Sequence, residues 1–137
     1  MQTPVIRFRV DFGRAEAVGP GKIALLEGIE RGGSLSQAAR DLKMSYRRAW
    51  QLLESLNGGF VVPVAVTARG GRGGGGATLT AFGRRLIRAY RDFDSEIQAR
   101  AARQFRPILR QARSHPGAGT LAREIGKSAP IMRLKDR

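Results

Sequence analysis

Residues 34–59 constrain the fold of this chain most, because their spacing predicts two short helices, each with its own start signal. Ser34 and Gln37 have the S-x-x-Q spacing of a capping box, in which a hydroxyl and an amide each satisfy a free backbone N–H. After a break of a few residues, Ser45 is a candidate N-cap for the second helix, and two glycines end that helix. Two such helices predict a helix-turn-helix, although an ordinary helical hairpin inside another domain has the same pattern.

Each of the two helices has one apolar stripe, formed by Leu35, Ala38, Ala39 and Leu42 in the first and by Ala49, Leu53 and Leu56 in the second. On the second helix, Arg47, Arg48 and Gln51 project away from the stripe, and Tyr46 and Trp50 flank it. Such donors are suited to phosphates and to base edges in the major groove, which favours a DNA-reading helix. We expect a supporting phosphate contact from Tyr46, whereas the position of Trp50 favours packing over DNA contact.

Three further polar residues of this region are expected to contact DNA. Ser36 and Gln37 belong to the preceding helix, and Ser45 begins the second helix. A protein that inserts residues 45–51 into the major groove brings such groups close to the sugar-phosphate strands.

Residues 61–79 predict a glycine-tipped hairpin, which beside a helix-turn-helix would be a wing. The segment Val61–Val66 is β-branched and apolar, the sequence TARGGRGGGGAT follows, and a short strand near Leu79 completes a two-stranded ribbon. Glycines let the backbone approach a groove closely, and Arg69 and Arg72 can then reach phosphates or the minor groove. A flexible linker is the alternative.

The segment before residue 34 predicts a strand followed by a helix. Residues 5–12 alternate between charged side chains and the apolar Phe8, Val10 and Phe12, which is typical of a half-buried strand. Gly19-Pro20 then predicts the first turn of a helix, and Gly32-Gly33 its end.

A single long helix is predicted from the N-cap Thr80 to about Phe105, with apolar residues at spacings of three or four: Phe82, Leu86, Tyr90, Phe93, Ile97 and Ala101. With roughly 26 residues and a rise of 1.5 Å per residue, it would be about 39 Å long, more than a compact domain of this size can cover. We therefore expect a second copy of the chain to bury this stripe in a homodimer. Packing on the chain's own C-terminal segment is the alternative.

The composition agrees with a nucleic-acid partner, because 25 basic and 11 acidic residues give a net charge of +14 on 137 residues. A chain of this length predicts one domain, or one domain with an appendage. We expect a winged helix-turn-helix domain over residues 1–105, with the dimerisation helix at about 80–105. Residues 106–137 would form a basic, partly flexible extension with short helices near 108–113 and 121–126.

The residue types also exclude several classes of function. Cysteine is absent and His115 is the single histidine, so no thiolate zinc site and no cluster of histidines can form. His115 lies beside a Pro-Gly turn, where we expect exposure to solvent. No pair of acids or Ser-His-Asp set is available, so we expect no enzyme, no catalytic residue and no metal site. No apolar run is long enough to cross a bilayer, and we expect a cytoplasmic protein.

The motifs SLSQAARDLKMSYRRAWQLLESLN, GGRGGGGATLT and GRRLIRAY occur in an order that resembles the N-terminal DNA-binding domain of the ModE family of molybdate-responsive bacterial transcription regulators. The resemblance covers residues 4 to about 105. It implies a winged helix-turn-helix that dimerises through the long helix and binds an inverted-repeat operator. It also implies a recognition helix at Ser45–Asn57 and a wing at Arg69–Gly76, with Arg72 replacing the lysine that is common in the family.

The chain departs from the family's pattern after the long helix. Family members that sense molybdate carry a further pair of small β-rich oxyanion-binding modules, whereas 32 residues follow the long helix here. We therefore expect a form that resembles the DNA-binding half alone and has no cofactor, with direct binding of molybdate or tungstate as an alternative.

Together these observations predict a mainly α fold with a small β component and a homodimeric, sequence-specific transcription regulator that binds double-stranded DNA. Two alternatives use the same residues differently. A non-specific, nucleoid-type DNA binder would need the positive charge but no operator. An oxyanion-sensing module would hold its ligand with the glycine-rich loop and its arginines.

Overall fold

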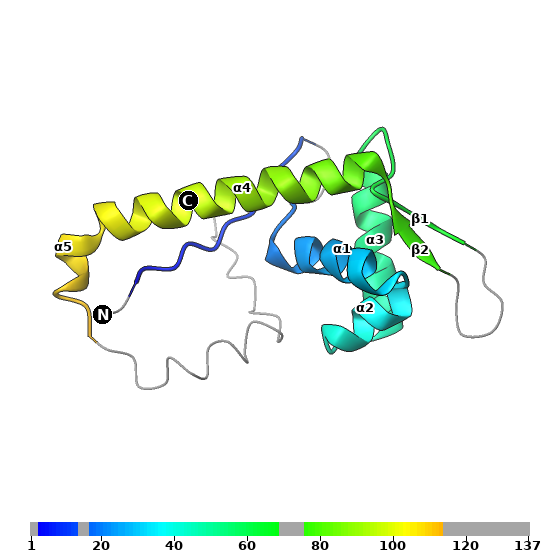
Figure 1. The fold of residues 1–137 in the computed structure, drawn as a ribbon, viewed down its shortest axis with the longest axis horizontal. Coiled ribbons are helices and arrows are strands. Elements are labelled where there is room, and N and C mark those ends of the chain that lie inside the picture. Colours follow the sequence, from blue (N-terminus) through cyan, green and yellow to red (C-terminus); the bar gives the residue numbers. More distant parts are fainter. Residues whose placement is uncertain (1–2, 14–16, 69–75, 114–137) are drawn as a thin grey trace, which may run out of the picture.

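Figure 1 shows the computed structural model, which describes residues 3–13, 17–68 and 76–113. In chain order the elements are α1 (Pro20–Gly32), α2 (Leu35–Asp41), α3 (Tyr46–Gly59), β1 (Ala65–Thr67), β2 (Ala77–Leu79), α4 (Ala81–Gln104) and α5 (Arg106–Leu109). Helices α1, α2 and α3 gather under one half of α4, and the two strands project beyond that end (Figure 1). The mainly α winged helix-turn-helix with a small sheet is thereby confirmed.

The predicted helix starts are confirmed, because each N-cap hydroxyl accepts a backbone N–H three residues later. Ser34 caps α2 at 3.0 Å, Ser45 caps α3 at 3.1 Å and Thr80 caps α4 at 3.0 Å. Helix α1 ends as predicted at Gly33, whose φ of 68° lies in the left-handed region that favours glycine. These local signals therefore fix where four of the helices begin or end.

The second half of the predicted capping box is wrong. The side chain of Gln37 does not return to the helix start, because its amide nitrogen donates to Asp41 Oδ1 at 2.8 Å. Its amide oxygen accepts a hydrogen bond from Arg40 at 2.9 Å. A partner one turn further along the helix therefore replaces the reciprocal contact that the spacing predicted.

The core lies where α1, α2 and α3 meet the first half of α4. Its largest fully buried side chains belong to Val18, Ile23, Leu25, Leu26, Ile29, Leu35, Leu56 and Val64. Helices α1 and α2 approach closely, since a Cβ at Gly28 would lie 3.0 Å from the Cβ of Ala38. The stripes predicted on α2 and α3 contribute to this core, with Leu42 only partly buried at its edge.

The N-terminal segment is extended but does not form the strand that its alternation predicts. Val10 and Val18 exchange two backbone hydrogen bonds at 2.9 Å in an isolated bridge. Further along, the side-chain amide of Gln98 takes the place of a neighbouring strand, accepting from Ile6 N at 2.9 Å and donating to Ile6 O at 2.7 Å. The segment therefore runs along α4 (Figure 1), and Phe12, predicted on the inner side, is 43% exposed.

Aromatic contacts fasten the same segment to the middle of α4. The ring of Phe8 stacks on Tyr90 with centroids 4.6 Å apart and meets the edge of Phe93 at 5.2 Å. The Tyr90 hydroxyl donates to the carbonyl of Phe8 at 2.9 Å. Burial raises the pKa of this hydroxyl, and the nearby Asp94 carboxylate adds to the effect, so the donor stays protonated to a higher pH than an exposed tyrosine does.

The hairpin is shorter than predicted, because its first strand begins at Ala65 and not at Val61. Val61 is fully exposed, and Pro63 has no backbone N–H to offer a partner strand. The side chain of Asn57 accepts from the Val64 N–H at 2.8 Å and donates to the Ala65 carbonyl at 3.1 Å. A side chain of α3 therefore holds the backbone at the base of the antiparallel β1–β2 pair.

The first turn of α4 is pressed against that same base. A Cβ at Gly83 would lie 2.0 Å from the carbonyl oxygen of Val64, so only glycine fits there without moving the backbone. The Thr80 hydroxyl donates to the Pro63 carbonyl at 2.6 Å, and Arg84 donates to the Leu79 carbonyl at 3.0 Å. These contacts join α4 to the hairpin.

Helix α4 has the predicted start and length, with 24 residues and a C-cap at Phe105. After it comes the single turn α5, which lies earlier than the short helix predicted near residues 108–113. The second short helix, predicted near 121–126, and His115 lie outside the described residues. None of the described helices is both long and apolar enough to cross a membrane.

Candidate nucleic-acid interface

Helix α3 has a buried side and an outer side, as the recognition-helix prediction requires. Ala49, Leu53 and Leu56 are at most 3% exposed and face the core. At about 100° per residue, Arg47 and Gln51 lie on the opposite side, and both are exposed. The helix therefore presents a guanidinium and an amide outward on a rigid, packed support.

Glu54 lies on the same outer side, one turn beyond Gln51, and is also exposed. Sequence reasoning missed this residue, because the candidates were side chains that can donate a hydrogen bond to phosphates or base edges. Glu54 follows Gln51 by three residues and Arg47 by seven, and this helical spacing predicts that all three lie on the outer side of α3. A carboxylate can accept from the amino group of cytosine but is repelled by phosphates, so Glu54 restricts how this face can meet DNA.

The two flanks of α3 differ in chemistry. Tyr46 and Trp50, four residues apart, form one flank and are 53% and 47% exposed. Arg48 is exposed on the other flank. The expectation that packing is favoured over DNA contact at Trp50 finds no support in burial, because the side chain is 47% exposed and the core under α3 is closed by Ala49 and the leucines of the stripe.

The turn between α2 and α3 positions the outer face. Lys43 has a φ of 56°, the left-handed conformation that non-glycine residues adopt rarely. The turn is closed by hydrogen bonds from Lys43 N to the Arg40 carbonyl at 3.1 Å and from Met44 N to the Ala39 carbonyl at 3.0 Å. The sequence predicts a break here, but nothing in it shows the left-handed residue.

The three remaining helix-turn-helix residues are less available than expected. Ser36 and Gln37 are half-buried, and the Gln37 side chain is held by Arg40 and Asp41. Ser45 is exposed, but its hydroxyl accepts the N–H of Arg48 as the helix cap. These residues therefore lie beside the outer face without projecting from it.

Lys22, a buried lysine of α1, contacts the side of α3 that faces the core, and sequence reasoning missed it. Lys22 of α1 is 9% exposed, and its Nζ donates to the Ala17 carbonyl at 3.1 Å and to the Ser55 hydroxyl at 3.3 Å. The signal was present, since position 22 precedes Leu25, Leu26 and Ile29 at the spacing of one helix face. This lysine is part of the support for α3 and not of its outer surface.

The wing arginines Arg69 and Arg72 lie outside the described residues, which resume at Gly76. The strands that would carry them are described, and they pair Ala65 with Leu79 and Thr67 with Ala77. The hairpin leaves the domain beside α3 (Figure 1).

The apolar stripe predicted for dimerisation divides into two parts. Leu86 and Tyr90 are buried in the chain's own core and have little surface left for a partner, and the partly buried Phe82 packs against that core. Ala101 is also buried, at 4% exposure. Phe93 is 49% exposed, and Ile97 is half-buried, as is Phe82.

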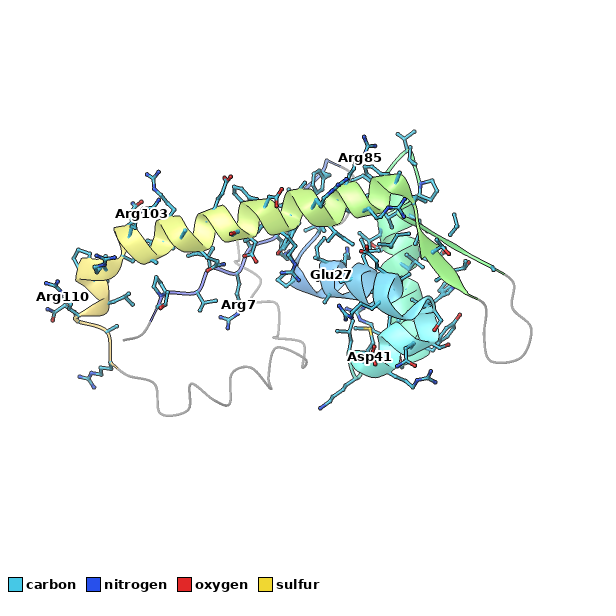
Figure 2. All side chains as sticks on the ribbon, viewed as in Figure 1. Arg7, Glu27, Asp41, Arg85, Arg103 and Arg110 are labelled. Atoms are coloured by element: carbon cyan, nitrogen blue, oxygen red, sulfur yellow. The ribbon has the colours of Figure 1, made fainter. Side chains whose placement is uncertain are left out.

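An open depression marks this second part of α4, lined by Phe93, Glu96, Ile97, Ala99, Arg100 and Arg103. Figure 2 shows Arg85 and Arg103 on the side of α4 that faces away from the other helices, and Glu27 between α1 and α4. Glu27 accepts two hydrogen bonds from Arg91, whose pKa this contact raises. Helix α4 thus forms an ion pair with its own domain through Arg91, and the depression on its second half combines apolar and charged side chains.

Comparison with known proteins gives relatives for most of this domain. The molybdenum transport protein ModE of Azotobacter vinelandii is 39% identical over 93 residues, which cover 68% of this chain and 34% of that protein. The DNA-binding transcriptional dual regulator ModE of Escherichia coli K12 is 43% identical over 82 residues, or 60% of this chain and 31% of that protein. The resemblance to the ModE family is thereby confirmed.

The ModE-like region also matches the molybdenum-pterin-binding protein MopB of Rhodobacter capsulatus, with 45% identity over 73 residues, or 53% of this chain and 27% of that protein. No family model matches the chain. The chain spans about a third of the length of the ModE relatives it matches.

Proposed function

We propose that this ModE-like chain is a sequence-specific, DNA-binding transcription regulator. The outer side of α3 carries the proposal, because Arg47 and Gln51 are exposed over a closed core on a helix with a fixed N-cap. A net charge of +14 adds attraction to a polyanion. The ModE relatives whose names describe transcription regulators support the same function.

Each residue of the proposed surface has a role that follows from its place. Arg47 and Gln51 face outward and read base edges in the major groove. Arg48, on the flank, contacts a phosphate. Arg69 and Arg72 of the wing grip the neighbouring backbone or minor groove.

Ser36, Gln37, Ser45 and Tyr46 contribute contacts at the edge of the proposed surface. The Ser45 and Tyr46 hydroxyls belong to the N-terminus of α3, where the positive end of the helix dipole favours an approaching phosphate. Ser36 and Gln37 lie in the first turn of α2 and offer a hydroxyl and an amide there. These contacts position the protein and carry little sequence information.

We further propose that the regulator is a homodimer that binds an inverted repeat. The second half of α4 extends past the domain's own core and carries Phe93 and Ile97 at its surface. A twofold pair of such helices would bury this apolar surface and place two copies of α3 on one face of the DNA. Half-sites about 34–36 Å apart, one helical turn, are then expected.

Selection of bound duplexes from a random pool tests the proposed function. The affinity of the selected sequence should exceed that of random duplex by about a thousandfold or more at one stated salt concentration. The variant Arg47→Ala should lose about ten- to a hundredfold on the selected sequence and less on random duplex. Equal affinity for both duplexes would identify the non-specific, nucleoid-type binder instead.

Calorimetry with molybdate, tungstate and sulfate on the DNA-free protein tests the alternative of an oxyanion sensor. Under the proposed function, none of the three anions releases or absorbs heat beyond that of dilution. Saturable binding of molybdate or tungstate, but not of sulfate, would add a direct effector to the regulator.

A further inference from the structure

We propose that Trp50, together with Tyr46, forms an aromatic flank of α3 that packs against one sugar-phosphate wall of the major groove. The inference rests on the proposed DNA binding and adds Trp50, for which the sequence favoured packing over DNA contact. It also divides α3 into a base-reading side and a backbone-binding side.

Exposure is the first observation. Trp50 and Tyr46 remain 47% and 53% exposed, although both come from a helix whose core side is tightly packed. The stacked and edge-on ring pairs of the described structure involve phenylalanines and Tyr90 near α4 and the loop after α3. The two aromatic residues of α3 thus present their rings to the surroundings of the domain.

Their direction is the second observation. Relative to the buried Ala49 and Leu53, Trp50 lies about a quarter of a turn round the helix axis, and Arg47 and Gln51 lie nearly opposite the core. A helix about 10–12 Å wide fills a major groove about 12 Å wide, so its outer side meets the base edges and its flanks meet the walls. When Arg47 and Gln51 face the base edges, Trp50 therefore faces one sugar-phosphate wall of the groove.

The chemistry of the two side chains fits a wall better than it fits base edges. An indole or phenol ring offers an apolar body to deoxyribose, and its N–H or O–H can donate to a phosphate oxygen. Such a contact is the same for every base sequence. Arg48 lies about a quarter of a turn from the core on the other flank and meets the opposite wall, so the two flanks hold the helix centred in the groove.

Tryptophan fluorescence tests the inference directly, because Trp50 is the single tryptophan of the chain. Addition of a selected duplex should change its emission with the same midpoint as the anisotropy of a dye attached to that duplex. Unchanged emission while the anisotropy rises would overturn the contact and leave the proposed function standing. If neither signal changes, the proposed function fails together with the inference.

Substitution separates a wall contact from base reading. Trp50→Ala should lower affinity roughly tenfold on the selected and on the random duplex alike, and Trp50→Phe, which keeps an apolar ring, about threefold. The slope of affinity against salt should not change, since the indole is neutral. A loss confined to the selected duplex, or no loss for Trp50→Ala, would overturn the assignment.

The matched control is Val61→Ala, which shortens a fully exposed apolar side chain in the loop after α3. It should bind both duplexes as the parent chain does. Circular dichroism should give the same helix content for all these proteins, because Trp50 lies outside the core cluster. A control variant that loses as much affinity as Trp50→Ala would also overturn the inference.

Discussion

The two halves of α4 are one continuous helix but are covered by different parts of the chain. The first half buries Leu86 and Tyr90 in the core formed with α1, α2 and α3. The second half is met by the extended N-terminal segment through Gln98 and leaves Phe93 at the surface. One apolar stripe is thus buried along only part of its length, so the length of the stripe alone does not show which residues are left for a partner.

The largest expected effect lies in the first half. Leu86→Ala should lower the free energy of unfolding by about 3 kcal/mol, because it removes buried methyl groups and leaves a cavity in the core. Thermal or urea unfolding of the dilute protein measures the loss. Ile97→Ala, a matched truncation in the second half, should cost clearly less, and equal losses would remove the distinction between the halves.

Substitutions in the second half of α4 should affect self-association more than folding. Phe93→Asp should weaken self-association at least tenfold, because it puts a charge into the apolar surface that a second copy would bury. Sedimentation over a range of concentrations measures this. Ser95→Asp adds the same charge at another exposed position of α4 and should leave association intact. A Phe93→Asp protein that associates like the parent would place the dimer interface elsewhere.

The N-terminal segment provides the third test. Gln98→Ala should cost about 1 kcal/mol of unfolding free energy, since it removes two hydrogen bonds to Ile6. Amide exchange at Ile6 should rise while exchange in the core stays slow. Protection of Ile6 in the variant would show that the segment does not depend on this side chain.

The smallest effect is expected where an ion pair joins the first half to α1. Glu27→Gln should lower stability by about 0.5 kcal/mol, because the Arg91 partner is 43% exposed and water screens the pair. The difference should shrink further at high salt. A loss as large as that for Leu86→Ala would mean that charge, and not apolar burial, holds the first half in place.

Local signals predicted the helical framework well, because a cap needs only neighbours in sequence. Ser34, Ser45 and Thr80 cap the helices they were expected to cap. The predicted strand failed because it depends on distant partners. The N-terminal segment alternates like a strand, but Gln98 lies 92 residues away from Ile6 and satisfies its backbone.

The candidate interface was predictable in outline for the same reason. Helical periodicity placed Arg47 and Gln51 outward, which the structure agrees with. It did not settle Trp50, since a residue at the border of a stripe can turn either way and only the packing of the neighbouring helices decides. The conformation of Lys43 likewise arises from how α2 meets α3.

The tight seat of Gly83 on the Val64 carbonyl has a mechanical consequence. With no space for even a methyl group, the start of α4 lies directly on the backbone at the base of the hairpin, and hydrogen bonds from Thr80 and Arg84 hold the two together. A change in the tilt of α4 would therefore move the β1–β2 hairpin with it. In the proposed homodimer, the angle at which the two α4 helices cross would set the distance between the two hairpins, and so the length of DNA that they can span.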